Sequence, residues 1–271
     1  MPAIQLARLK KQVSELADLY HDPVAFRRLL TDILDFYADR THRFGYAGEP
    51  PPILPTHNVP APVMRQIIKE LSTHASMDAE SSLNLIDYLW KQSYLEENLL
   101  AAYLLGFIEP GNSEQIIKRV NTWLETKPEE ILLNTILENS LANLLKSAPE
   151  MVIQAIEEWL AAPDQYYQHV GLKAIQPLID QNKFDDLTVI FKLITPYIRS
   201  SSIVIQPDVI DVLISLARRT PSETAYTLRR ILEASDNNNA AWYVRQTIKH
   251  FPNDIQSKLR DLLHENRKRK Q

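Results

Sequence analysis

The segment from residue 83 to residue 107, LNLIDYLWKQSYLEENLLAAYLLGF, most constrains the fold of this chain. Its apolar residues recur at helical spacing up to Trp90, and a second, wider apolar face runs from Tyr94 to Phe107. This pattern predicts two amphipathic helices joined at a tight corner. Because neither helix can bury its apolar face alone, further helical pairs must stack on each side.

The rest of the chain supplies helical pairs of the same kind. Corners that contain Pro, Asn or Asp recur along the sequence, and proline at such a corner begins a helix. The predicted helices span residues 3–19, 24–39, 60–74, 79–92, 94–109, 113–126, 129–147, 149–161, 165–182, 184–199, 206–219, 222–234, 239–250 and 254–264. The predicted fold class is therefore all-α, a right-handed α-solenoid of HEAT-like helical hairpins of the armadillo type, with residues 1–265 in a single domain.

Two segments depart from the helical pattern. Residues 41–62 contain six prolines and two of the five glycines, so we predict a proline-rich loop there. Such a loop is usually a packed cover or a mobile linker, and a binding loop is the alternative. Residues 266–271, NRKRKQ, are predicted to form a disordered basic tail.

Composition excludes several kinds of site. The chain contains no cysteine, which excludes thiolate chemistry and fits a cytoplasmic location. No apolar run approaches the roughly 18 residues of a membrane span. Glycine-rich phosphate loops and paired histidines at metal-binding spacing do not occur in the sequence. We therefore expect no membrane contact, no metal and no cofactor, and we expect a monomer.

Two motifs carry a resemblance to a known family. They are NVPAPVMRQIIKEL at residues 58–71 and YLEENLLAAYLLG at residues 94–106. They resemble the V-P-x-P-x-[LM]-R-x-I and E-E-R-x-L-A-x-x-L-L-G stretches of the HEAT-like DNA alkylation repair family. Weaker similarity continues through Trp159 and residues 166–169 to residues 245–250.

The resemblance implies a C-shaped α-solenoid whose concave face holds duplex DNA. In active members of the family, an aspartate on that face acts with two tryptophans and with arginines, and a cationic N-alkylated purine is lost without entering a pocket. An alkylated purine is a good leaving group, so a carboxylate that stabilises the developing positive charge on the sugar could suffice.

The position of the family's catalytic aspartate differs in this chain. Asn139 falls there, and an amide cannot replace a carboxylate because it carries no charge. Thr135 stands where the first tryptophan is expected. Glu138 is the one carboxylate that a shift of the alignment by one residue would supply; the alternative is a solvated glutamate on the outer face.

The family's other site positions also differ. His169 occupies the position of a DNA-contacting arginine, while its aromatic neighbour is retained as Tyr166. The second tryptophan and its arginine correspond to Asp211 and Ile214.

Basic residues near the C-terminal end are the best candidates for contacts with DNA phosphates. Residues 201–271 carry 12 Lys and Arg against 8 Asp and Glu, although the whole chain has a net charge of -4. The candidates in this part are Arg218, Arg229, Arg245 and Lys249. Residues 78–164 are acidic, so a DNA cradle there would require their carboxylates to face the convex side.

Three functions remain open at this point. The first is a non-catalytic member of the family that binds duplex or branched DNA through backbone contacts, which a basic concave face would favour. The second is a protein interaction scaffold, which an acidic or apolar groove would favour. The third is an active glycosylase for N-alkylated purines that uses Glu138.

Overall fold

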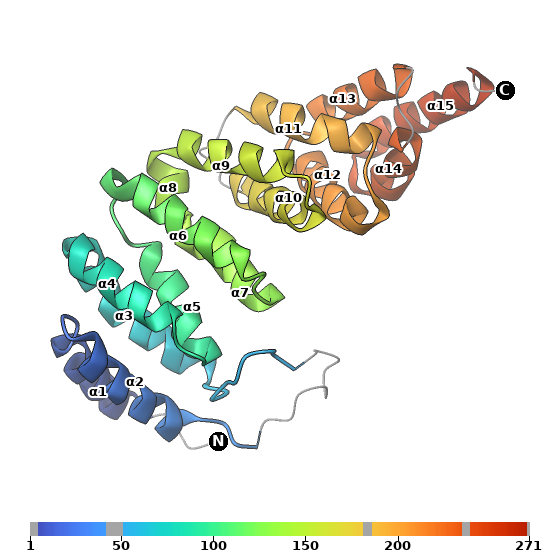
Figure 1. The fold of residues 1–271 in the computed structure, drawn as a ribbon. Coiled ribbons are helices and arrows are strands. Elements are labelled where there is room, and N and C mark those ends of the chain that lie inside the picture. Colours follow the sequence, from blue (N-terminus) through green and yellow to red (C-terminus); the bar gives the residue numbers. More distant parts are fainter. Residues whose placement is uncertain (1–4, 42–50, 181–185, 235–238, 270–271) are drawn as a thin grey trace. The chain divides into compact units, whose positions relative to one another are not determined.

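The computed structural model describes residues 5–41, 51–180, 186–234 and 239–269, and within them the chain is helical and contains no strand (Figure 1). This result confirms the all-α class. The α-helices are α1 (Leu6–Asp18), α2 (Pro23–Tyr37), α3 (Ala61–Met77), α4 (Ala79–Trp90), α5 (Leu95–Leu105), α6 (Ser113–Glu125), α7 (Glu130–Thr135), α8 (Ala142–Ser147), α9 (Pro149–Ala161), α10 (Gln165–Asp180), α11 (Leu187–Arg199), α12 (Gln206–Arg219), α13 (Pro221–Glu233), α14 (Ala240–Thr247) and α15 (Asn253–Arg269). Between them lie the 3₁₀ turns η1 (Pro110–Asn112), η3 (Ile203–Ile205) and η4 (Ile248–His250) and the π-helix η2 (Ile136–Ser140).

The predicted corners mark where the helices begin. The Asp22 carboxylate accepts hydrogen bonds from the backbone N–H groups of Val24 and Ala25, both at 3.1 Å, and Pro23 is the first residue of α2. An aspartate cap followed by proline satisfies free N–H groups of the first turn and fixes its backbone. Each observed helix that matches a prediction begins within three residues of the predicted start.

The chain folds as two compact units, Met1–Val152 and Ile153–Gln271, which are described separately below. A single domain over residues 1–265 therefore stays a prediction.

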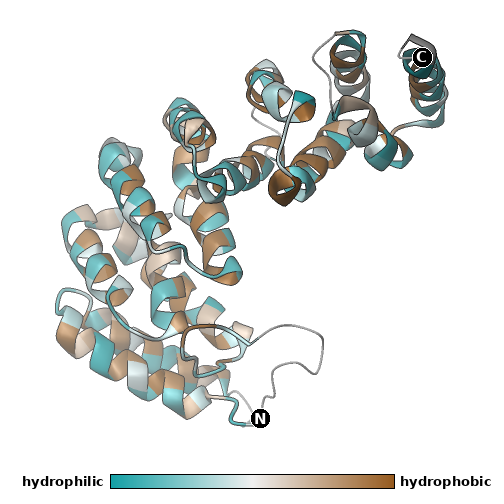
Figure 2. Ribbon diagram, turned by 45° about the vertical axis from the view of Figure 1, so that its right-hand side comes forward, coloured by the Kyte–Doolittle hydropathy of each residue, from teal (hydrophilic) through white to brown (hydrophobic). Residues whose placement is uncertain are grey.

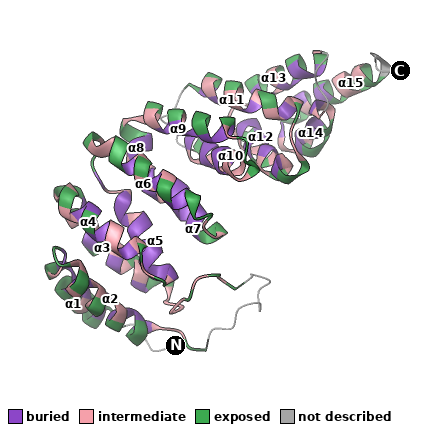
Figure 3. Cartoon of the chain, viewed as in Figure 1, coloured by how far each residue is buried: buried purple, intermediate pink, exposed green. Residues whose placement is uncertain are grey.

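The first unit consists of two layers of helices. Helices α1, α3, α5 and α7 pack side by side in that order, and α2 packs against α4 in the second layer. Their apolar stripes face one another, and buried residues follow the sides on which the helices meet (Figure 3). Leu71, Leu85 and Leu100, for example, are fully buried. The Trp90 ring stacks on the buried Trp123 ring, with centroids 4.0 Å apart.

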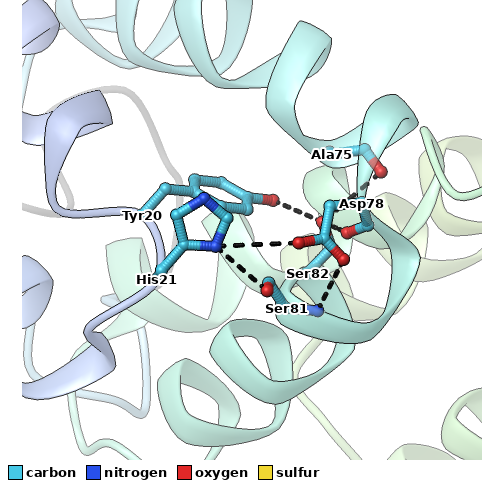
Figure 4. Close-up of polar contacts among 6 residues, drawn as sticks. All are labelled: Tyr20, His21, Ala75, Asp78, Ser81 and Ser82. Atoms are coloured by element: carbon cyan, nitrogen blue, oxygen red, sulfur yellow. Dashed lines mark hydrogen bonds and ion pairs between the residues drawn. The ribbon is translucent and has the colours of Figure 1, made fainter.

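A polar cluster joins the corner between α1 and α2 to the corner between α3 and α4 (Figure 4). Buried Tyr20 shares a hydrogen bond of 2.8 Å with the Ser82 hydroxyl, and its ring stacks on His74. The His21 Nδ1 atom lies 3.0 Å from the Ser81 hydroxyl and 3.6 Å from an Asp78 carboxylate oxygen. Side chains thus connect two consecutive helical hairpins at this end of the unit.

Residues 51–60, which we call the strap, cover the start of α5. The Pro55 carbonyl accepts a hydrogen bond of 2.9 Å from the Leu95 N–H, and the Thr56 hydroxyl donates to the Glu96 carboxylate at 2.6 Å. The Ile53 and Leu54 N–H groups donate to the Glu129 carboxylate at 3.0 and 3.2 Å. This half of the proline-rich loop is therefore a packed cover; residues 42–50 lie outside the described residues.

The second unit also has two layers. Helices α10, α12 and α14 pack side by side in one layer, and α11, α13 and α15 pack in the other. The hydrophobic faces of these helices turn towards their neighbours (Figure 2). Gly171 allows close packing of α10 on α9, because a Cβ atom at this position would lie 2.7 Å from Leu160 Cγ.

The structure corrects two of the predicted elements. The predicted helix over residues 129–147 is interrupted by η2, in which the backbone hydrogen bonds follow the wider π pattern. The predicted disordered tail from residue 266 is helical as far as Arg269, because α15 continues beyond residue 264. Basic residues at the end of a helix interact favourably with its dipole.

Candidate nucleic-acid interface

The π-helix η2 holds both residues of the predicted catalytic position. Glu138 is exposed, and Asn139 is half-buried. The buried Ser140 hydroxyl donates a hydrogen bond of 2.8 Å to the Ala102 carbonyl of α5, which fixes the π turn against that helix. Single π turns within α-helices are frequent at functional sites.

Gly106 explains how the π turn fits against α5. A Cβ atom at Gly106 would lie 1.9 Å from the Asn139 carbonyl oxygen, so the two backbones leave no room for a side chain. Thr135, at the predicted tryptophan position, is buried and donates its hydroxyl proton to the Ile131 carbonyl of its own helix. The segment therefore presents an exposed Glu138 carboxylate, and a buried threonine occupies the predicted tryptophan position.

In the second unit, the predicted arginine position is part of a pair between helices. His169 on α10 places Nδ1 2.7 Å from an Asp208 carboxylate oxygen on α12. The Asp208 side chain is 11% exposed and that of His169 is 27% exposed. Tyr166, one turn earlier on α10, is half-buried and meets Tyr167 edge to face. The predicted arginine position is thus occupied by a histidine that pairs with a carboxylate.

Asp211 adds a second carboxylate to this surface. Burial raises the pKa of the Asp211 carboxyl above its ordinary value, Asp208 raises it further, and Lys173 opposes both effects. Asp208 and Asp211 on α12 therefore lie close to His169 and Lys173 on α10. This patch of mixed charge has no excess of positive charge with which to attract phosphates.

Two of the predicted phosphate-binding residues do lie together. Burial lowers the pKa of the His250 imidazole, and the positive charges of Lys249 and Arg218 lower it further. Arg218 lies in the last turn of α12, and Lys249 and His250 form most of η4, which packs against α12. Arg218 and Lys249 are exposed, and we call these three residues the basic cluster.

The other two predicted phosphate-binding residues are arranged differently. Arg245 is exposed on α14, one turn before Lys249. Arg229 lies on α13 in the other layer, where its Nε atom donates to the Glu233 carboxylate at 2.9 Å. The structure therefore brings Arg218 and Lys249 together but separates Arg229 from them.

Sequence reasoning missed other polar groups with unusual surroundings. Glu96 and Glu97 are buried in the first turn of α5, where Glu97 accepts a hydrogen bond of 2.9 Å from Arg27 Nε. The E-E motif could have indicated them only through the family resemblance. His250 was also missed, since a single histidine beside Lys249 gives no signal until the fold brings Arg218 to it as well.

Within the described residues, no group of three or more His, Asp or Glu side chains is arranged to hold a metal ion. None of the helices in this part of the chain is both long and apolar enough to cross a membrane.

The paired helices and the placement of two sequence motifs indicate the class of protein. The chain is an all-helical protein built of paired helices, in which the V-P-A-P motif leads into α3 and the E-E motif opens α5. The profile of the family described as DNA alkylation repair enzyme matches residues 49–251, and the chain belongs to this family. This membership places it among proteins related to DNA repair. No curated protein matches the chain at a significant level.

Proposed function

We propose that this protein binds duplex DNA through backbone phosphates at the basic cluster, assisted by Arg245, and that it excises alkylated bases inefficiently or not at all. The observation that carries the proposal is the proximity of Arg218, Lys249 and His250 on a member of a DNA repair family. Neutralisation of phosphates by such groups supplies most non-specific affinity for DNA.

The arrangement of helices supports the finer description of the fold. In each unit, consecutive helices pack as two layers, as expected for HEAT-like hairpins of an α-solenoid. In the second unit, the predicted positions Tyr166 and His169 lie on α10, and the basic cluster lies on α12 and on η4, which follows α14. We assign DNA binding to the basic cluster.

Weak or absent catalysis follows from the residues at the family's site. The Asn139 amide carries no charge, and Thr135 bonds to its own helix. An exposed Glu138 would act in a surrounding of high dielectric constant, where a carboxylate stabilises a developing positive charge poorly.

The test is a binding titration with labelled plain, methylated and branched duplexes at two or more salt concentrations, with base release measured in the same samples. We expect salt-dependent binding without release. In the double variant that carries Arg218→Gln and Lys249→Gln, the slope of log affinity against log salt should fall by about 0.9 for each phosphate that is no longer neutralised. Arg229→Gln serves as a matched comparison, and its effect should be smaller because Glu233 already pairs with Arg229. An unchanged slope in the double variant would contradict the proposal.

A protein scaffold is the second candidate, and the carboxylates at Asp208 and Asp211 favour it. A basic segment of a partner could bind there, whereas phosphate could not. If no duplex binds at low salt and Asp211→Asn weakens capture of a lysine-rich peptide, the scaffold replaces the DNA proposal.

An active glycosylase is the third candidate. Release of an alkylated purine that is lost in Glu138→Gln, but kept in Asn139→Ala, would establish Glu138 as the catalytic carboxylate.

A further inference from the structure

A groove lies between α11 and α13 in the second unit, in the layer opposite to α10, α12 and α14. Its volume is about 660 Å³, within the range of pockets that bind organic ligands. Rows of side chains one helical turn apart form its two walls. The row Leu187, Phe191 and Thr195 lies on α11, and the row Ser222, Tyr226 and Arg230 lies on α13.

An aromatic side chain projects into this groove. Tyr226 is 62% exposed, which is unusual for so large a ring on a helix whose other face is buried. Phe191 is half-buried in the facing wall. The two side chains thus place one aromatic ring on each wall of the groove.

Positive charge accompanies the aromatic rings. The Arg230 guanidinium lies over the Tyr226 ring, 6.0 Å from its centroid, and Lys192 lies on the opposite wall. Both cations are exposed, and no carboxylate of the described residues forms an ion pair with either. They are therefore available to an anionic ligand.

The remaining lining is polar. Hydroxyl groups come from Thr188, Ser222 and Thr227, and Glu223 contributes one carboxylate, whereas the Thr195 hydroxyl already donates to the Phe191 carbonyl of its own helix at 2.6 Å. Hydroxyls can donate to phosphate oxygens, and a carboxylate can accept from the N–H groups of a base edge. An acidic amphipathic helix would instead require a continuous apolar floor, which these hydroxyls interrupt.

We propose that this groove binds an unpaired segment of single-stranded nucleic acid, with a base stacked on Tyr226 and phosphates held by Lys192 and Arg230. Aromatic platforms along a positively charged groove are the features with which proteins hold single strands. The site is separate from the basic cluster, and it does not depend on duplex binding there.

The test is fluorescence anisotropy of the full-length protein with labelled oligodeoxythymidine, which does not pair with itself. Loss of a stacked base weakens binding by about 1–3 kcal/mol, so Tyr226→Ala should weaken binding about fivefold or more. Tyr226→Phe should retain binding, because it keeps the ring. Trp242→Ala, which removes an exposed ring from α14, is the matched control and should have no effect.

Salt dependence tests the role of the two cations. Lys192→Gln and Arg230→Gln should each reduce the slope of log affinity against log salt by about 0.7, the value for one neutralised phosphate on a single strand. Lys258→Gln on α15 is the control and should leave the slope unchanged. Far-ultraviolet circular dichroism checks that each variant keeps its helices.

The proposal would be overturned if wild type and Tyr226→Ala bound the oligonucleotide with equal affinity, or if the salt slopes were unchanged in both cation variants. It would also be overturned if the protein did not bind the oligonucleotide but bound a glutamate-rich peptide in a way that depends on Tyr226. The variants Arg218→Gln and Lys249→Gln separate the two sites, since they should weaken duplex binding and leave oligodeoxythymidine binding intact. Either site can thus fail alone.

Discussion

Gly106 is a residue whose replacement the backbone tolerates poorly. An alanine Cβ at this position would lie 1.9 Å from the Asn139 carbonyl oxygen, and neither group is the flexible end of a side chain. We expect Gly106→Ala to lower the free energy of unfolding by about 1–3 kcal/mol, the usual cost of overpacking. Urea unfolding measures the change. Gly111→Ala is the control, because a Cβ there meets nothing within 4 Å and should leave stability almost unchanged.

Tyr20 links stability to alkaline pH. Burial raises the pKa of its phenol from 10.0 to about 12. The unfolded chain releases this proton near pH 10 while the folded chain retains it, so the stabilisation is full below pH 10 and is lost as pH rises towards 12. In Tyr20→Phe, the decline of the free energy of unfolding over this interval should be shallower. Denaturant titrations at several pH values would show an unchanged decline if the assignment is wrong.

His250 links DNA binding to pH. Burial and the neighbouring cations hold its pKa below the usual value in the free protein. A phosphate bound in the basic cluster would reverse the effect of Lys249 and Arg218 and favour the charged imidazole. The affinity for duplex DNA should therefore rise as the pH falls through the range in which imidazoles take up a proton, and His250→Gln should weaken this pH dependence. Anisotropy titrations across pH test it; identical pH profiles for both proteins would place the DNA elsewhere.

At the level of the helices, an ion pair connects α2 with α5. Glu97 is 1% exposed and its partner Arg27 is 36% exposed, so the carboxylate depends on the guanidinium for compensation. Arg27→Met should destabilise the protein by about 3 kcal/mol, because it leaves a buried charge without its partner. The double variant with Glu97→Leu should recover much of this loss. Thermal unfolding measures the stability of the single and the double variant. An equal loss of stability in both would show that the two residues are not coupled.

The helices themselves could largely be predicted from the sequence, because their corners carry local signals such as Asp22-Pro23. The π turn at residues 136–140 could not be predicted, since over so short a stretch the spacing of apolar residues does not distinguish π-helical from α-helical hydrogen bonding. The end of α15 was also missed, because a run of basic residues is typical of disordered tails and of helix ends alike.

The candidate site could be predicted only in part, because the charged residues that lie close together come from different helices. Arg218 and Lys249 are distant in sequence and meet through the packing of η4 on α12. Arg229, like Arg218, belongs to a pair of consecutive arginines, but it lies in the other layer and pairs with Glu233. The pairing of His169 with Asp208 likewise depends on the packing of α10 on α12.

At the level of the whole molecule, charge is unevenly divided between the units. Residues 1–152 contain 14 Lys and Arg against 20 Asp and Glu, whereas residues 153–271 contain 16 against 14. Non-specific attraction of nucleic acid should therefore act on the second unit.

Hydrogen exchange measured by mass spectrometry can test this division. Duplex DNA should slow exchange in peptides from the end of α12 and from α14 with η4, and oligodeoxythymidine should slow it in peptides from α11 and α13. Peptides of the first unit should remain unchanged. Slower exchange around Glu138 on addition of duplex would instead show that DNA reaches the family's catalytic position.

The close approach of Gly106 to Asn139 constrains how the sequence can vary in evolution. A π-helix places one more residue in each hydrogen-bonded turn than an α-helix does. Loss of one residue from 136–140 would restore a continuous α-helix and withdraw the Asn139 carbonyl from α5. The glycine and the extra residue must then be kept or lost together, so second-site suppressors of Gly106→Ala should be single-residue deletions in this turn.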